Sequence, residues 1–301
     1  MRNFHLNIAD YHLGFEAAEP STELMLAEKF TNFRDKGTTP GVTIRVHART
    51  FRPQQQARRV FHAPYIIESA DKKHKVNDEF WSVWQQGKET LIETILPLGL
   101  TGRKAWLKTG TGTNAWDLYV DGPGNRIDPL EYPLDGLLLY YLTVMTGDIF
   151  IHGSGVSMNN KGYFFTGASG KGKTTIARLW NEAGATVIHD DRLIIRNKKA
   201  GFVMYNTPVY NNESPRSSPV DSIFIIDHGT TNKLVPLQNS EALSLVMANC
   251  IQHLWDPSII VSLTETLHQL TSQKSVYRLY FRPDKSVVPF ILMNDSKRNH
   301  T

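Results

Sequence analysis

Gly167-Ala168-Ser169-Gly170-Lys171-Gly172-Lys173-Thr174 stands near the middle of the chain. This stretch fits G-x-x-x-x-G-K-[ST], the pattern of a phosphate-binding loop, or P-loop. Residues 163–166, directly before it, are β-prone and predict a strand. Residues 175–183, directly after it, have helical spacing, and Gly184 can end that helix. Strand, glycine-rich loop and helix therefore follow one another in the order that the pattern requires.

The residue types in this stretch suit the binding of a nucleotide. Its glycines allow backbone conformations closed to residues with a Cβ, so that successive N–H groups can point toward an anion. The helix that follows adds the positive end of its dipole. In this pattern Lys173 contacts the β- and γ-phosphates and the Thr174 hydroxyl ligates Mg²⁺. We therefore expect ATP and Mg²⁺ as cofactors, with a nucleotide-binding set of Gly167, Ala168, Ser169, Gly170, Lys171, Gly172, Lys173, Thr174 and, more weakly, Thr175.

Two adjacent carboxylates, Asp190 and Asp191, come next along the chain. They follow the β-prone run 185–189 and precede a second one at 193–195. At the end of a strand, one carboxylate can hold Mg²⁺ while the other accepts a proton from an attacking hydroxyl. The alternative is a polar turn between two strands with no chemical role. The nearby glycine-rich loop favours the catalytic interpretation.

Taken together, these motifs resemble HPr kinase/phosphorylase and, more broadly, P-loop kinases of the phosphoenolpyruvate carboxykinase-like superfamily. The resemblance is carried by His152-Gly153, the loop with its strand and helix, and Asp190-Asp191-Arg192. It implies that His152 and the two aspartates converge on the γ-phosphate. It also implies Asp190 as general base, Asp191 as the main metal-linked carboxylate and a mixed, strongly bent sheet. Roughly the first hundred residues lie outside the resemblance.

The departures from that family limit the functions that the resemblance implies. The second, glycine-rich signature linked to phosphorylase activity is not found, and the further metal ligands of the much longer carboxykinases have no counterpart here. Neither HPr as substrate nor decarboxylation of oxaloacetate is therefore implied. The main hypothesis is a kinase that transfers the γ-phosphate of ATP to a hydroxyl of a protein, peptide or small molecule. The alternative is an ATP-binding regulatory or assembly protein with little or no turnover.

We predict an α/β (α+β) fold with a β-rich N-terminal domain, residues 1–128, and an HPr-kinase-like P-loop domain, residues 129–301. Apolar and polar residues alternate over 4–8 and 41–47, as in half-buried strands. Four tryptophans in this first part are either core residues or a platform for a sugar or nucleobase, and core packing is the commoner role. They are Trp81, Trp84, Trp106 and Trp116.

The second part of the chain predicts a helix over residues 133–145 and a strand over 220–226. Residues 206–219 between them are polar, contain three prolines and have the character of a mobile active-site loop. Arg216 in this loop is either a surface arginine or a charge that moves onto the transferring phosphate. Further predicted elements are a helix capped by Ser240 and ending near 254, a helix starting at Asp256-Pro257, and a strand over 276–281.

The overall composition agrees with these hypotheses. The 301 residues are 41% hydrophobic and 21% charged, which is typical of globular chains, and the net charge of +4 suits an anionic ligand. So small an excess does not argue for nucleic acid. Cys250 is the only cysteine, no signal-peptide pattern opens the chain, and the apolar run 137–145 is too short for a bilayer. We expect a cytoplasmic protein with no membrane partner, and whether it forms a homo-oligomer stays open.

Overall fold

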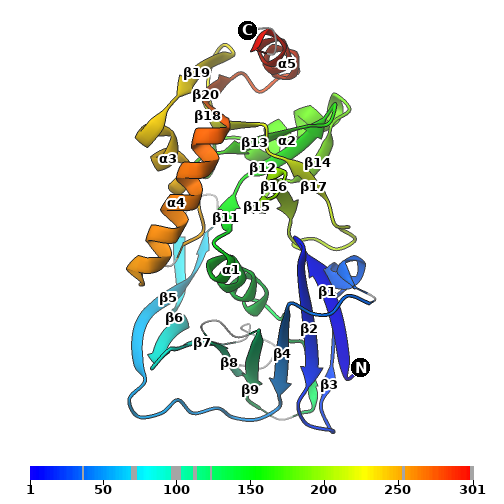
Figure 1. Ribbon diagram of the computed structural model, residues 1–301, viewed down its shortest axis with the longest axis vertical. Coiled ribbons are helices and arrows are strands. Elements are labelled where there is room, and N and C mark those ends of the chain that lie inside the picture. Colours follow the sequence, from blue (N-terminus) through cyan, green and yellow to red (C-terminus); the bar gives the residue numbers. More distant parts are fainter. Residues whose placement is uncertain are drawn as a thin grey trace. The chain divides into compact units, whose positions relative to one another are not determined.

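The computed structural model describes residues 1–35, 37–68, 73–95, 103–110, 114–122, 124–252 and 255–298. Backbone contacts divide the chain into two compact units. The first unit holds Met1–Met145 together with Pro208–Ser214, and the second holds Thr146–Thr207 and Pro215–Thr301. The described residues form several sheets and few helices, so the prediction of a mixed α/β fold is confirmed at this level (Figure 1).

The first unit is built on an eight-stranded sheet with the order β1-β2-β4-β9-β8-β7-β6-β5. Phe4, Leu6 and Ile8 point into its core, and the alternation predicted for residues 4–8 and 41–47 is confirmed. Strands β2, β4 and β9 are parallel to one another, and the other neighbours are antiparallel. The strands are β1 (Asn3–Ile8), β2 (Tyr11–Ala17), β4 (Val42–His47), β5 (Arg58–Glu68), β6 (Lys73–Gln86), β7 (Glu89–Ile95), β8 (Lys104–Gly110) and β9 (Ala115–Val120).

The tryptophans of this unit are packing residues. Trp106 and Trp116 are buried in the core, while Trp81 and Trp84 are half-buried. The Trp84 ring centroid lies 6.0 Å from that of Trp106. Packing against neighbouring rings is the role that large aromatic side chains most often have.

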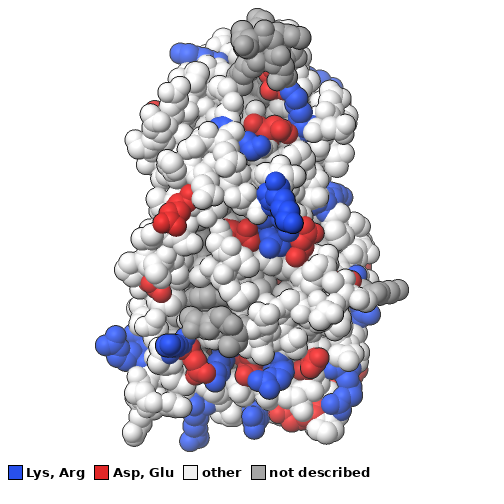
Figure 2. Space-filling model, in the orientation of Figure 1, with Lys and Arg blue, Asp and Glu red and all other residues white. Residues whose placement is uncertain are grey.

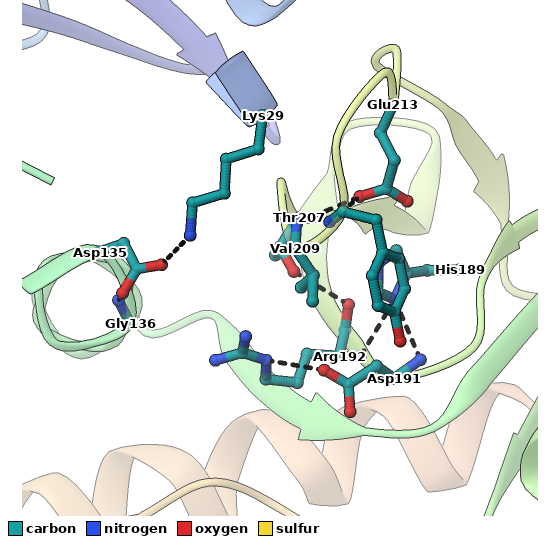
Figure 3. Close-up of polar contacts among 10 residues, drawn as sticks. Lys29, Asp135, Gly136, His189, Asp191, Arg192, Thr207, Val209 and Glu213 are labelled. Carbon is teal, nitrogen blue, oxygen red and sulfur yellow. Dashed lines mark hydrogen bonds and ion pairs between the residues drawn. The ribbon is translucent and has the colours of Figure 1, made fainter. Parts of the chain in front are cut away.

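Smaller elements complete the first unit: β3 (Glu23–Leu24), the 3-10 helix η1 (Glu28–Phe33), β10 (Arg126–Ile127) and most of α1 (Leu134–Thr146). Helix α1 was predicted at 133–145 and is apolar almost all round, as expected of a buried helix. Its buried Asp135 accepts a hydrogen bond from Lys29 at 2.5 Å (Figure 3). The sequence places this segment in the second domain, whereas the structure groups it with the first unit up to Met145.

The second unit contains a six-stranded mixed sheet with the order β14-β12-β13-β18-β20-β19. Strands β13, β18 and β20 are parallel, so their carboxyl ends lie at one edge of this sheet. A four-stranded antiparallel sheet, β11-β15-β16-β17, accompanies it. The strands are β11 (Ile149–His152), β12 (Ser154–Met158), β13 (Lys161–Thr166), β14 (Thr186–His189), β15 (Arg192–Lys198), β16 (Gly201–Asn206), β17 (Ser217–Pro219), β18 (Ser222–His228), β19 (Lys233–Leu237) and β20 (Ser275–Phe281).

Both faces of the central parallel strands are buried. On β13, Phe164 belongs to a core shared with α3 (Asn239–Met247) and α4 (Pro257–Gln273). Its neighbour Phe165 belongs to a second core shared with α2 (Lys173–Glu182) and α5 (Val287–Arg298). Burial on two sides explains why these strands are continuous apolar runs.

The helices near the C-terminus differ in part from their predictions. The helix predicted to end near residue 254 stops at Met247, because the chain then turns to meet β11, where Asn249 O accepts from His152 N at 3.0 Å. The predicted cap Ser240 is wrong, since Gln238 occupies the N-cap position of α3. The start of α4 is confirmed, and the Asp256 carboxylate accepts from Ser258 N at 2.9 Å.

Candidate functional site

The glycine-rich loop joins the carboxyl end of β13 to the first turn of α2. Its backbone requires glycine: Gly170 and Gly172 have φ of 80° and 95°, values that residues with a Cβ rarely adopt. A Cβ on Gly172 would also lie only 2.9 Å from Cζ of Phe281. Gly172 is the N-cap of α2 and has no side chain with which to cap it, so the first-turn N–H groups suit an anion.

Lys173 folds over this loop. Its Nζ donates hydrogen bonds to Gly167 O at 2.7 Å and to Ala168 O at 3.1 Å. Burial lowers the pKa of the Lys173 ammonium, and the charge of Asp191 partly offsets this effect. The hydroxyl of Ser154 donates to Lys173 O at 2.8 Å and fixes the start of α2. The ammonium thus lies at the mouth of the loop, and the hydrogen bonds described for it are with neutral carbonyl groups.

Backbone hydrogen bonds bring the His-Gly pair and the two aspartates to this loop. Strand β11 pairs with β15 so that His152 lies opposite Arg192, and Gly153 N donates to Asp191 O at 3.1 Å. The Thr166 hydroxyl, one residue before the loop, donates to His152 O at 2.7 Å. These contacts tie three segments together: 152–153, the end of β13, and the turn that carries the aspartates.

The charges of these residues act on one another. The pKa of His152 is lowered, chiefly by desolvation of the imidazole among neighbouring groups, although the residue is exposed, and also by the Arg192 and Lys173 charges, while Asp191 opposes the shift. The neutral imidazole is therefore favoured at neutral pH. The Asp191 carboxylate accepts from Arg192 Nε at 3.0 Å (Figure 3). Asp191 is thus close enough for its charge to act on His152, Lys173 and Arg192 alike.

Asp190 and Asp191 lie in the turn between β14 and β15, at the end of a strand as predicted, and both are half-buried. The turn is held by a residue that the sequence analysis missed, His189. Its Nδ1 accepts from Asp191 N at 3.0 Å and from Arg192 N at 3.1 Å (Figure 3). Because both partners are donors, Nδ1 carries no proton. The sequence feature that could have indicated this role is a histidine directly before the aspartate pair, at the end of a β-prone run.

Arg216 lies elsewhere in the same unit. Its guanidinium donates to Val187 O on β14 at 3.0 Å, and its backbone N donates to the Asn206 side chain at 2.8 Å. The contacts described for this residue are thus with β14 and β16, and none of them joins it to the glycine-rich loop.

The polar stretch predicted as a loop at 206–219 is shorter in the structure, because β16 ends at Asn206 and β17 begins at Ser217. Residues Pro208–Ser214 belong to the first unit. There the Glu213 carboxylate accepts from Val209 N at 3.1 Å and from Tyr210 N at 3.0 Å (Figure 3). Asn32 of η1 donates to Glu213 O at 3.0 Å.

Two more residues that the sequence analysis missed, Asp227 and His228, end β18 beside the loop. The Lys171 ammonium lies 2.8 Å from Oδ1 of Asp227, and His228 Nε2 lies 3.2 Å from Gly170 O. The sequence predicts 220–226 as a buried strand, and that prediction gives no role to Asp227 or His228. The sequence feature that could have indicated their role is the polar pair Asp227-His228 directly after that strand.

The residues at the loop fit a magnesium ion that arrives with a nucleotide. Within the described part of the chain, no group of three or more His, Cys, Asp or Glu side chains is arranged to hold a metal ion. Mg²⁺ commonly takes one or two protein ligands, with phosphate oxygens and water completing its shell. The exposed Thr174 and the half-buried Asp191 are oxygen donors of the required kind.

Charged side chains of both signs lie on the surface, and no helix among the described residues can span a membrane. Figure 2 shows basic and acidic side chains interspersed on the face in view, as a net charge of +4 implies. Among the helices of the described residues, none combines the length and apolar character needed to cross a bilayer.

Some solved structures of known proteins are similar to this chain. No protein-family model and no curated protein matches the chain. Among solved structures, the Hpr(Ser) kinase/phosphatase from Coxiella burnetii is similar at 12% identity, covering 50% of this chain and 95% of that one, with a TM-score of 0.29.

Proposed function

We propose that the protein is a Mg-ATP-dependent kinase that transfers the γ-phosphate to a hydroxyl group of a protein, a peptide or a small molecule. One observation carries the proposal: the glycine-rich loop with Lys173 at its mouth is tied to the turn of Asp190 and Asp191 through residues 152–153, by a hydrogen bond from the Thr166 hydroxyl to His152 O and one from Gly153 N to Asp191 O. Nucleotide-binding and proton-accepting groups therefore lie at one edge of one sheet. We also propose the finer fold assignment, a P-loop kinase domain like that of HPr kinase.

The nucleotide phosphates would lie against the N–H groups of the loop and the first turn of α2. Lys173 now donates to two neutral carbonyls, and the charged oxygens of a phosphate attract its ammonium more strongly than a neutral carbonyl does. The β- and γ-phosphates would therefore draw the ammonium away from Gly167 O and Ala168 O. The glycines of the nucleotide-binding set act through their backbone N–H groups.

Mg²⁺ would be held by the Thr174 hydroxyl and the Asp191 carboxylate, together with phosphate oxygens and water. The ion supplies neutralisation of the charge on the transferring group. Arg192 donates to Asp191 and fixes the position of that carboxylate. The neutral form of His152 that the lowered pKa favours can donate one hydrogen bond to a γ-phosphate oxygen.

Asp190 is the general base in this scheme. In the proposed arrangement Asp190 faces the acceptor while Asp191 faces the metal. The acceptor hydroxyl oxygen bonds to the γ-phosphorus as the bond from that phosphorus to the bridging oxygen breaks. The proton passes to Asp190, and ADP leaves. Arg216 would neutralise the transferring phosphate only after leaving Val187 O.

A second candidate is an ATP-binding regulatory protein with little turnover. The observation that favours it is the position of Arg216, whose described contacts are with β14 and β16. Such a protein would bind Mg-ATP with the same residues and transfer phosphate to no acceptor.

The first test measures binding of Mg-ATP by titration calorimetry. Lys173→Ala should weaken the affinity roughly 10- to 100-fold, because hydrogen bonds between charged groups contribute about 1.5–3 kcal/mol. Lys161→Ala, at the other end of β13, is the matched control and should leave the affinity unchanged. Equal binding by the wild type and Lys173→Ala would place the nucleotide site elsewhere.

The second test separates the two candidate functions. Wild type and Asp190→Asn are incubated with γ-labelled ATP and a cell lysate, and labelled acceptors are detected. Label transfer by the wild type and its loss in Asp190→Asn is the result expected of a kinase. Tight binding without any transfer would favour the regulatory protein.

A further inference from the structure

The carboxyl end of β18 contacts the glycine-rich loop at two points. Strand β18 runs parallel to β13 with Ile225 opposite Thr166, so the residues two and three places further on lie beside the loop. Asp227 Oδ1 lies 2.8 Å from the Lys171 ammonium. His228 Nε2 lies 3.2 Å from Gly170 O, within hydrogen-bonding distance of the loop backbone.

The Asp227 carboxylate is held in its charged form at this position. Its Oδ1 also accepts from the backbone N of His228 at 2.8 Å. The Lys171 hydrogen bond, followed by that backbone N–H, lowers the pKa of Asp227. The negative charge therefore stays on Asp227 at neutral pH and offsets the positive charge of Lys171.

Lys171 is one of two lysines in the loop, and the two are held differently. Lys173 donates to neutral carbonyl oxygens, whereas Lys171 is paired with a carboxylate. An anion that enters the loop can contact the Lys173 ammonium directly, whereas the charge of Lys171 is already neutralised by Asp227. Both members of the pair are partly exposed, at 38% for the Lys171 side chain and 35% for Asp227. Exposed pairs of this kind are weak and can be broken by a competing anion.

We propose that Asp227 competes with nucleotide phosphates for Lys171, so that the Lys171–Asp227 pair is an autoinhibitory contact built into the loop. Lys171 turns from Asp227 to the phosphates when a nucleotide binds and returns to Asp227 when it leaves. His228 holds the backbone at Gly170 during this exchange. The inference deepens the proposed function, on which it rests, because it assigns a regulation to the same nucleotide site.

The test compares the affinities of four proteins for inorganic pyrophosphate and for Mg-ATP by calorimetry: wild type, Asp227→Asn, Lys171→Met and the double variant. Asp227→Asn should bind both ligands about 3- to 10-fold more tightly at low salt, and the gain should shrink as salt screens the charges. Lys171→Met should bind them more weakly. In the Lys171→Met background, Asp227→Asn should change the affinity less than about 2-fold, since the competition has been removed.

Asp295→Asn is the matched control. Asp295 is paired with Lys161 at 2.7 Å, at the opposite end of β13, so this variant removes the same charge without touching the loop. Its affinities should equal those of the wild type. Asp227→Asn is expected to tighten binding and Lys171→Met to weaken it, so a general folding defect cannot produce the expected pattern.

The possible results separate this inference from the proposed function. Unchanged or weaker binding by Asp227→Asn, or equal tightening in the Lys171→Met background, overturns the inference. If wild-type binding then still depends on Lys173, the proposed nucleotide site stands. Binding that becomes measurable only in Asp227→Asn supports the inference. Failure of wild type and Asp227→Asn alike to bind either ligand overturns the inference and the proposed function together.

Discussion

At the scale of single residues, the two aspartates between β14 and β15 have different surroundings. The Asp191 carboxylate accepts from Arg192 Nε, and its charge acts on Lys173 and His152. Asp190 precedes it in the same turn, and both side chains are half-buried. The action of the Asp191 charge on Lys173 and His152 supports its proposed role beside the metal, with Asp190 as the base that faces the acceptor.

Asn substitutions at these two positions test that division. Asp190→Asn should keep its affinity for Mg-ATP and lower turnover by about 10²- to 10⁴-fold, the usual contribution of a general base. Asp191→Asn should lower turnover and also raise the Mg²⁺ concentration needed for half-maximal rate. Steady-state kinetics over a series of Mg²⁺ concentrations measures both effects. Normal transfer with weakened Mg²⁺ dependence in Asp190→Asn would reverse the two roles.

At the scale of elements, the turn between β14 and β15 depends on an acceptor inside the protein. His189 is 2% exposed, and its Nδ1 accepts two backbone N–H groups. A buried donor that loses its partner costs about 1–3 kcal/mol. The position of both aspartates in the site therefore depends on this imidazole.

His189→Phe should lower the free energy of unfolding by about 2–4 kcal/mol, because it leaves two donors without an acceptor. In His189→Asn, the amide oxygen can take the place of Nδ1, and a large part of the stability should return. Urea unfolding of both variants measures the difference. Equal losses in the two variants would show that ring packing, and not the acceptor, stabilises the turn.

At the scale of the whole molecule, each of the two units has buried apolar residues and titratable groups whose pKa values are shifted by burial. In the first unit, burial raises the pKa of Asp128 to about 6, and the neighbouring Glu131 adds to the shift, although a hydrogen bond from Leu130 N opposes it. A carboxyl group whose pKa is raised by folding binds its proton more tightly in the native state. Asp128 therefore destabilises the first unit progressively as pH rises from about 4 to about 6, and fully above that range.

Asp128→Asn should remove this loss, since the amide oxygen can still accept from Leu130 N at 2.9 Å. At pH 7.5 the variant should be more stable than the wild type by about 1–3 kcal/mol, and the gain should fall toward zero near pH 4. Thermal unfolding at several pH values measures it. A gain that is equal at pH 4 and pH 7.5 would show that ionisation of Asp128 is not its cause.

The amino-acid sequence by itself determined the elements whose residues are neighbours in the chain. The strand before the glycine-rich loop, the helix after it and the strand end before Asp190 were predictable, because local alternation and helical spacing decide them. Only the tertiary structure decided which distant segments meet. Asp227 reaches Lys171 across a sequence separation of 56 residues because β18 pairs with β13, and His152 reaches Arg192 through the pairing of β11 with β15. The grouping of α1 and residues Pro208–Ser214 with the first unit has the same origin. Strand order depends on the burial of whole sheet faces, which no local pattern encodes.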